Sequence, residues 1–189
     1  EAKVCIMGIP FDGAVSCGKG AALAPEKIRS LSRYLPATTE TGKIIKNLKV
    51  YDLGDVAIDL DWARYFREVE DRAYNLMKAD KFSLFLGGDH SVTIPLHKAF
   101  GRYSKEKGFR KIGVIHFDSH ADICDTYDGH KWSHACTERR TVEDVIGPED
   151  LAYLGLRSYE VEELEYFEAH PEVLVIKAYD VFRDGYLAC

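Results

Sequence analysis

Short apolar runs alternate along this 189-residue chain with longer segments that carry helical periodicity or helix-start signals. The apolar runs, which predict buried strands, span residues 3–9, 48–53, 82–86, 111–117, 151–156 and 173–176. The predicted helices span residues 25–34, 62–77, 91–100 and 160–168. Strands that are apolar on both faces and alternate with helices are typical of an α/β fold with a mostly parallel sheet.

Local signals support several of these boundaries. Pro25 suits the first turn of a helix, because its missing N–H would be unpaired there anyway. Asp61 can cap the next helix, which carries an apolar stripe. The stripe consists of Trp62, Tyr65, Phe66, Val69, Ala73, Leu76 and Met77. Residues 11–22 and 118–131 are predicted to form loops.

Composition narrows the class of protein. With 46% apolar residues, the chain can bury one substantial core, and we expect a single domain over residues 1–189. The net charge of −6 comes from interspersed charges, without the basic block that a nucleic acid partner would need. No apolar run approaches the roughly 20 residues that span a membrane. Five cysteines without a CxxC pair argue against a disulfide framework or a structural zinc site, and favour a reducing cytoplasm.

The strongest chemical signal directly follows the apolar run that ends at Phe117. Asp118, His120 and Asp122 alternate in sequence, so in extended backbone their side chains project to one side. Carboxylate oxygens and imidazole nitrogens suit Mn²⁺, Zn²⁺ or Fe²⁺. A bound cation would also remove the repulsion between the two carboxylates. A loop of solvated polar residues is the alternative, and this motif alone leaves both interpretations open.

A second polar group, Gly87-Gly88-Asp89-His90-Ser91, lies between a predicted strand and a predicted helix. If the strands before the two motifs are neighbours, His90 faces the donors at 118–122 across one crevice, at the strand ends where such sheets bind ligands. Asp89 either orients an imidazole or caps the helix. Two such motifs on successive strands favour a metal site over a simple capped turn.

These motifs resemble those of the ureohydrolase family of arginases and agmatinases. The resemblance rests on GGDHS, on FDSHAD and on the histidine in Trp132-Ser133-His134-Ala135, with supporting matches at residues 8–12, 24–29 and 53–56. It implies an arginase-like three-layer α/β/α fold, a homo-oligomer (trimer or hexamer) and two Mn²⁺ ions per subunit of the complete enzyme.

The resemblance also implies a role for each motif residue. His90 and Asp122 would bind one manganese, Asp118 would bridge the two ions, and His120 would bind the second. A hydroxide made acidic by the two cations would attack the guanidinium carbon of a small-molecule substrate. His134 would help to protonate the leaving nitrogen, giving urea and an amine.

The other histidines and the nearby cysteines carry weaker signals. His116 lies inside a predicted strand and alternates with the site residues, so we expect a core or supporting role rather than a ligand role. We expect His97 to be structural, His130 to lie at the surface and His170 to lie in a turn. Cys124 and Cys136 flank the site loop, and without a general base beside them we interpret them as passive.

The sequence favours agmatine as the substrate, with putrescine, a polyamine precursor, as the amine product. The matching segment of arginases usually reads DAHTDIN, and its Asn helps to hold the carboxylate of the substrate. The resemblance places Cys124 at the position of that Asn. The Ser133-His134-Ala135-Cys136 segment followed by Arg139-Arg140 is more similar to agmatinases. Arginase, guanidinobutyrase and formiminoglutamase activities remain open.

The sequence departs from the family at its end. The third family motif, SxDxDxxDP, is absent, and residues 185–189 resemble the strand that leads into it. The first metal then keeps His90, Asp118 and Asp122, and the second keeps only Asp118 and His120. We therefore hypothesise that the chain is incomplete at its C-terminus, and we expect weak metal binding and little activity from it alone. A non-catalytic family member that lacks the third motif is the alternative.

Overall fold

The apolar run near the start of the chain forms the central strand of a parallel sheet. The computed structural model describes residues 2–185, and these divide into two units, residues 2–99 and 100–185. The first unit holds β1 (Val4–Ile9), β2 (Val50–Asp55) and β3 (Phe82–Gly87) in the order β2-β1-β3. Val4 pairs with Val50 on one side and with Phe82 on the other. The chain therefore crosses from one edge of this sheet to the other between β2 and β3.

Helices of the first unit follow the predicted caps. Helix α1 (Ala24–Ser32) has a proline in its first turn, and a short 3-10 turn, η1 (Ala21–Leu23), precedes it. Helix α2 (Trp62–Lys78) begins after Asp61, whose side chain accepts a hydrogen bond from the Arg64 amide at 3.0 Å. The buried residues of α2 are Tyr65, Phe66, Val69, Ala73, Tyr74 and Leu76. Most of the predicted stripe is thus confirmed as the core side of this helix.

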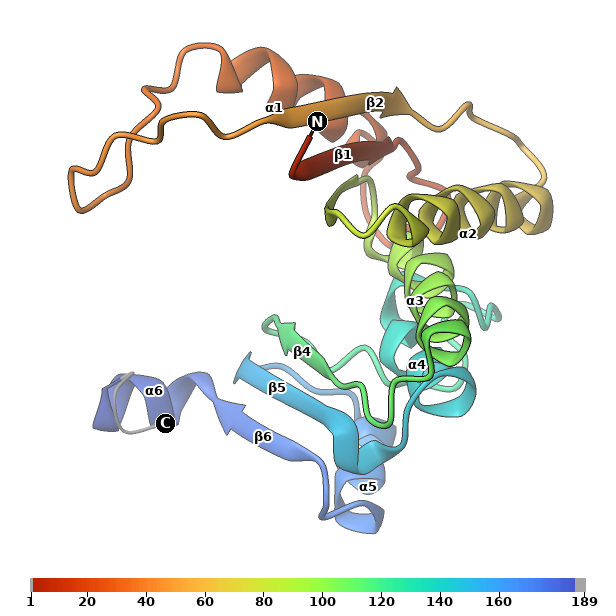
Figure 1. Ribbon diagram of the computed structural model, residues 1–189. Helices are drawn as coiled ribbons and strands as arrows, with labels where there is room; N and C mark the ends of the chain where they lie inside the picture. The colour runs from red at the N-terminus through yellow and green to blue at the C-terminus, as the bar shows by residue number, and fades with distance from the viewer. Residues whose placement is uncertain (1, 186–189) are drawn as a thin grey trace. The chain divides into compact units, whose positions relative to one another are not determined.

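The second unit holds three further parallel strands, β4 (Val114–Phe117), β5 (Leu151–Leu156) and β6 (Leu174–Lys177), which run side by side in this order (Figure 1). Its helices are the end of α3 (Thr93–Lys107), then α4 (Thr137–Asp144), α5 (Val161–Ala169) and α6 (Ala178–Asp184). The 3-10 turns of this unit are η3 (His134–Cys136) and η4 (Pro148–Asp150), whereas η2 (His90–Val92) belongs to the first unit. The expected α/β organisation on parallel strands is confirmed in each unit.

The core of the second unit includes part of the polar loop that follows β4. Ala121 and Ile123 are almost fully buried and pack in one cluster with Leu151, Tyr153 and Leu156 of β5. The loop therefore alternates between polar side chains and apolar ones that anchor it in the core.

Several boundaries differ from the prediction. Strand β4 begins at Val114 rather than at residue 111, and α3 continues to Lys107 rather than ending near residue 100. Helices α4 and α6 were not predicted; α4 has the sequence TERRTVED, which lacks an apolar stripe. Of the segment 185–189, which was interpreted as the start of a strand, residues 186–189 lie outside the described part of the chain.

Two further features bear on the class of protein. None of the helices between residues 2 and 185 combines the length and the apolar character that a bilayer crossing requires. Cys5, Cys17, Cys124 and Cys136 are free thiols, and only Cys17 among them is exposed.

The packing of β5 generates a stability prediction. Leu151 is 1% exposed in the core of the second unit, so Leu151→Ala should leave a cavity and lower the free energy of unfolding by about 2–5 kcal/mol. Leu164→Ala is the matched control, because Leu164 is 46% exposed on α5. Urea unfolding followed by circular dichroism measures both; equal midpoints for the two variants would contradict this placement of the core.

Candidate metal centre

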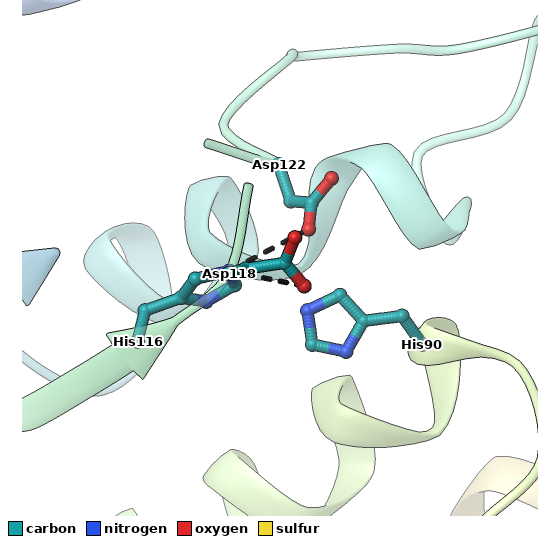
Figure 2. Close-up of side chains that lie close together, drawn as sticks. All are labelled: His90, His116, Asp118 and Asp122. Atoms are coloured by element: carbon teal, nitrogen blue, oxygen red, sulfur yellow. Dashed lines mark ion pairs between the residues drawn. The ribbon is translucent and has the colours of Figure 1, made fainter. Parts of the chain in front are cut away.

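Strand β4 brings a histidine and an aspartate to one point at its carboxyl end. His116 lies in the strand and Asp118 just beyond it, so their side chains project to the same side of the backbone. His116 Nε2 lies 3.9 Å from Asp118 Oδ2 and 3.6 Å from Asp122 Oδ2, as the dashed lines of Figure 2 show. One ligand atom from each of these three residues lies within 4.8 Å of the other two.

The loop conformation that presents Asp122 depends on the backbone around it. Asp122 has φ of 52°, a left-handed conformation that Asp adopts more readily than most residues. Its carbonyl oxygen accepts a hydrogen bond from the Glu138 amide at 2.9 Å, and the Tyr153 hydroxyl donates to the Ala121 carbonyl at 2.8 Å. The Ile123 amide donates to Glu163 Oε1 at 3.1 Å. These contacts hold the backbone at and on both sides of Asp122.

Hydrogen bonds from the residues that follow β5 hold the backbone next to Asp118. The Ser119 carbonyl accepts hydrogen bonds from the amides of Arg157 and Ser158, at 2.9 and 3.0 Å, directly after β5. Asp118 Oδ1 accepts from the His120 amide at 3.0 Å and from the Ser119 hydroxyl at 3.2 Å. The Asp118 carboxylate is therefore oriented by its own loop.

The donors of this group fit a divalent cation. Two carboxylates and one imidazole offer oxygen and nitrogen ligands of the kind that Mn²⁺, Zn²⁺ and Fe²⁺ accept. Asp122 is largely buried, with 8% of its side chain exposed, whereas 35% of Asp118 is exposed. The group therefore has one protected and one accessible carboxylate, and a cation between them would offset their mutual repulsion.

His120 lies beside Asp118 but outside this group of three. Its ring is 62% exposed, with Nδ1 3.5 Å from Asp118 Oδ1 and 3.2 Å from the Ser119 hydroxyl. Asp118 thus contacts both His116 and His120. The ligand role of His120 stays a prediction.

His134 stands in the same unit and begins η3. Its half-buried ring lies edge-on to Tyr127, with ring centroids 5.4 Å apart, and its Nδ1 is 3.2 Å from the Ser133 hydroxyl. The Cys124 amide donates to the Ala135 carbonyl at 3.1 Å, which ties η3 to the end of the site loop. The expected role of His134 in proton transfer stays a prediction.

His90, labelled in Figure 2, belongs to the first unit, where it begins η2 directly after β3. Asp89 is confirmed as a cap: its Oδ1 accepts from the Ser91 amide at 3.0 Å, and its Oδ2 accepts from the Ala14 amide at 2.8 Å. Gly88 approaches the Phe11 carbonyl so closely that a Cβ would lie 1.9 Å from that oxygen, which explains the glycine. In the described sheets β3 and β4 are not paired, so the meeting of His90 with the donors of the second unit stays a prediction.

His116 is buried, as its expected core or supporting role requires, and its partner Glu138 was not predicted. His116 Nδ1 lies 2.8 Å from Glu138 Oε1, and both side chains are almost completely buried. Alternation with Asp118 already indicated the side to which His116 points. Nothing in the sequence singled out Glu138, because it lies 22 residues away in the polar helix α4.

The cysteines beside the loop are unsuited to nucleophilic chemistry. Cys124 and Cys136 are both buried, and burial raises the pKa of each thiol, that of Cys136 to about 11. A thiol with a raised pKa holds little thiolate near neutral pH. This supports the interpretation of both residues as passive.

Comparisons with known proteins agree with this geometry. The sequence pattern of the arginase family matches residues 2–188. An agmatinase from Bacillus cereus is 36% identical over 168 residues, which cover 88% of this chain and 56% of the relative. A guanidinobutyrase from Pseudomonas aeruginosa is 33% identical over 156 residues, covering 80% of this chain and 47% of the relative. The chain therefore spans about half the length of the curated relatives that it matches.

Solved structures confirm the fold class. The crystal structure of an agmatine ureohydrolase from Thermoplasma volcanium matches with a TM-score of 0.85 and 30% identity, covering 98% of this chain and 60% of that one. The arginase-like α/β class, with parallel sheets flanked by helices, is thereby confirmed.

The support of the site loop by Glu163 predicts a pH-dependent stability. Burial raises the pKa of Glu163 above its ordinary value of 4.5. The folded chain then holds this proton more tightly than the unfolded chain, so stability falls as pH rises from 4.5 through the raised pKa. Glu163→Gln removes the titration, and wild type should lose stability relative to this variant across that window.

Urea unfolding midpoints at a series of pH values from 4.5 to 8 measure this difference. Glu165→Gln on the exposed side of α5 is the control and should follow the wild-type profile. A difference between wild type and Glu163→Gln that is the same at every pH would contradict the prediction.

Proposed function

The chain belongs to the arginase family, and we propose that it carries the first part of a binuclear manganese site that hydrolyses a guanidino compound, agmatine, to putrescine and urea. The observation that carries the proposal is the convergence of Asp118 and Asp122 with an imidazole at the end of β4, in a chain whose family match spans residues 2–188. The names of the Bacillus cereus and Thermoplasma volcanium relatives support agmatine.

We assign the metal ligands by the family pattern. His90 and Asp122 would hold one ion, Asp118 would contribute to both, and His120 would hold the second. The contact of His120 Nδ1 with Asp118 Oδ1 at 3.5 Å supports a shared ion for these two residues. When bound, two manganese ions supply Lewis acidity that makes water a nucleophile near neutral pH.

The remaining chemistry belongs to the residues of the chain. His134 is half-buried against Tyr127, so its ring has a restricted orientation while retaining access to solvent. In our proposal it passes a proton to the leaving nitrogen, a transfer that typically contributes about 10²–10⁴-fold to a rate. The carboxylates of Asp118 and Asp122 would bind the cations whose positive charge the reaction requires.

The environment of Cys124 supports agmatine over arginine. In arginases the residue at this position helps to hold the α-carboxylate of the substrate. Here the side chain is 2% exposed, and burial raises its pKa, so it presents neither a charge nor a strong donor to a carboxylate. Agmatine lacks that carboxylate, and its recognition does not need such a contact.

Two alternatives have their own support. Guanidinobutyrate is favoured by the Pseudomonas aeruginosa relative, and arginase or formiminoglutamase activity belongs to the same reaction class. A non-catalytic family member is the alternative from a different class. Urea release by the natural gene product separates these possibilities.

The proposed setting follows from the family. We infer a cytoplasmic homo-oligomer, a trimer or a hexamer, that acts in polyamine biosynthesis on a small-molecule substrate. Sedimentation of the natural gene product tests the oligomeric state.

The substrate prediction is tested with the natural gene product loaded with Mn²⁺. We expect urea release from agmatine to exceed that from arginine and from 4-guanidinobutyrate in kcat/KM, because Cys124 cannot hold a carboxylate. Faster turnover of arginine would contradict the assignment, and no urea from any substrate would favour the non-catalytic alternative.

Substitutions test the roles in the site. His134→Asn should lower kcat by roughly 100-fold or more while metal content is unchanged, since it removes a proton donor and not a ligand. Asp122→Asn should lower the Mn²⁺ content itself, measured by elemental analysis after dialysis. The control is His170→Asn, because His170 pairs with Glu172 after α5 and lies outside the metal centre. Loss of metal in His134→Asn would contradict these roles.

A further inference from the structure

A cavity of about 390 Å³ lies in the second unit, at the opposite end of β4 from the candidate metal centre. Its lining comes from the turn between α3 and β4 and from the segment between α4 and β5. Ile112 lies just before β4 and Asp150 just before β5, so the cavity is at the amino ends of these strands. The four residues of β4 separate it from Asp118 by about 13 Å. The cavity is therefore a separate site, of a size that commonly holds a small molecule.

We propose that this cavity binds the phosphate group of a small molecule through Lys105, Arg110 and the hydroxyl group of Ser104. The proposal goes beyond the hydrolysis proposed above and does not depend on the metal centre. It concerns residues of the second unit alone.

The end of α3 determines which residues line the cavity. Gly108 has φ of 70°, and its amide donates to the Lys105 carbonyl at 3.2 Å. The Phe109 amide donates to the Ser104 carbonyl at 3.0 Å. These two hydrogen bonds form the Schellman motif that ends many helices. They turn the chain at Gly108, so that Arg110 lines the same cavity as Ser104 and Lys105 of the last helical turns.

Ser104 provides the observation that points to a ligand. This residue is 3% exposed, and its Oγ has no hydrogen-bond partner among residues 2–185. A serine within a helix can donate to the carbonyl four residues earlier, and Ser104 does not do so. Buried hydroxyl groups in proteins nearly always have a partner, because an unpaired one costs free energy. An anionic ligand in the cavity would provide the missing acceptor.

Two positive charges are available to the same ligand. Lys105 and Arg110 are both exposed, and neither side chain has an ion pair within the described residues 2–185. The planar guanidinium group of arginine matches the oxygens of a phosphate, and an ammonium group adds a second charged donor. Two cations and a hydroxyl group together can donate hydrogen bonds to three phosphate oxygens.

The carboxylates of the lining already have partners. Asp150 Oδ1 lies 2.8 Å from Lys111 Nζ, and Glu143 Oε1 lies 2.9 Å from Arg139 Nε. Asp144 is not without a partner either. The Schellman motif also satisfies two of the carbonyl oxygens at the end of α3, which would otherwise attract a cation. These features favour an anion over a cation as the ligand.

The test titrates the metal-free 189-residue chain with inorganic phosphate in about 0.15 M KCl and follows its backbone amides by ¹H–¹⁵N NMR. The amide signals of residues 104–112 should shift and reach saturation, because they surround the site. The amide signals of residues 118–123, beyond the other end of β4, should stay in place. Shifts that grow in proportion to phosphate without saturation would overturn the proposal, as would equal shifts in both segments.

Substitutions test the three contacts. Lys105→Gln and Arg110→Gln should each weaken phosphate binding by roughly fivefold or more, because each removes a charged hydrogen-bond donor. Ser104→Ala should weaken it by roughly threefold, as expected for a neutral donor. Its urea unfolding midpoint should not fall, since the lost hydroxyl group has no partner in the chain. Unchanged phosphate affinity in all three variants would refute the site.

Lys107→Gln is the matched control. It removes the same charge from the same end of α3, but Lys107 Nζ lies over the Tyr103 ring, 5.6 Å from its centroid, and Lys107 is not among the residues that line the cavity. Phosphate affinity should change by less than about twofold, since exposed charges outside the site interact weakly with the ligand. Equal losses in Lys105→Gln and Lys107→Gln would show non-specific attraction and overturn the proposal.

Two further probes identify the class of ligand. Acetate should bind more weakly than phosphate, because a carboxylate offers two oxygens to three donors; equal affinity would overturn the assignment to phosphate. Phenyl phosphate distinguishes the two sources of a phosphate group. Phe109, which is 51% exposed, and Ile112 offer apolar surface in the lining, so we expect phenyl phosphate to bind more tightly than inorganic phosphate. Equal affinities of these two would assign the site to inorganic phosphate itself.

Discussion

Two carboxylates held close together at the carboxyl end of β4 are the constraint around which the second unit is organised. Asp118 and Asp122 offer oxygens within 4.8 Å of one another, and unit charges about 4 Å apart repel by about 4 kcal/mol at the effective dielectric of a protein surface. The backbone must hold them there against this repulsion until a cation offsets it. The loop is consequently fixed at several points from its own unit.

Those fixed points explain why a polar motif is part of the core. Along residues 118–123 the side chains divide: Asp118, His120 and Asp122 are the predicted ligands, while Ala121 and Ile123 are buried in a core cluster. Tyr153 of β5 and Glu163 of α5 then hold the intervening backbone by hydrogen bonds at 2.8 and 3.1 Å. The site and the core are therefore two sides of one segment, and core packing sets the precision of the carboxylates.

The sequence predicted those features that depend on local pattern. The strand positions, the Asp61 and Asp89 caps and the DxHxD motif all follow from residues adjacent in sequence, and the structure has them. Helix α4 was missed because its buried face is formed by residues such as Glu138 and Arg140 rather than by an apolar stripe. The buried state of Glu138 depends on His116, a contact across 22 residues that no local pattern encodes.

The same physical reasoning bears on substrate selection. The loop that begins with two ligand carboxylates ends at Cys124, whose side chain turns into the core and whose amide is bonded to the Ala135 carbonyl. This end of the loop is therefore used to anchor η3 and its His134, not to contact the far end of a substrate. On the function proposed above, Cys124 would therefore disfavour arginine by offering its α-carboxylate no contact, and a choice between agmatine and guanidino acids would need side chains of other segments.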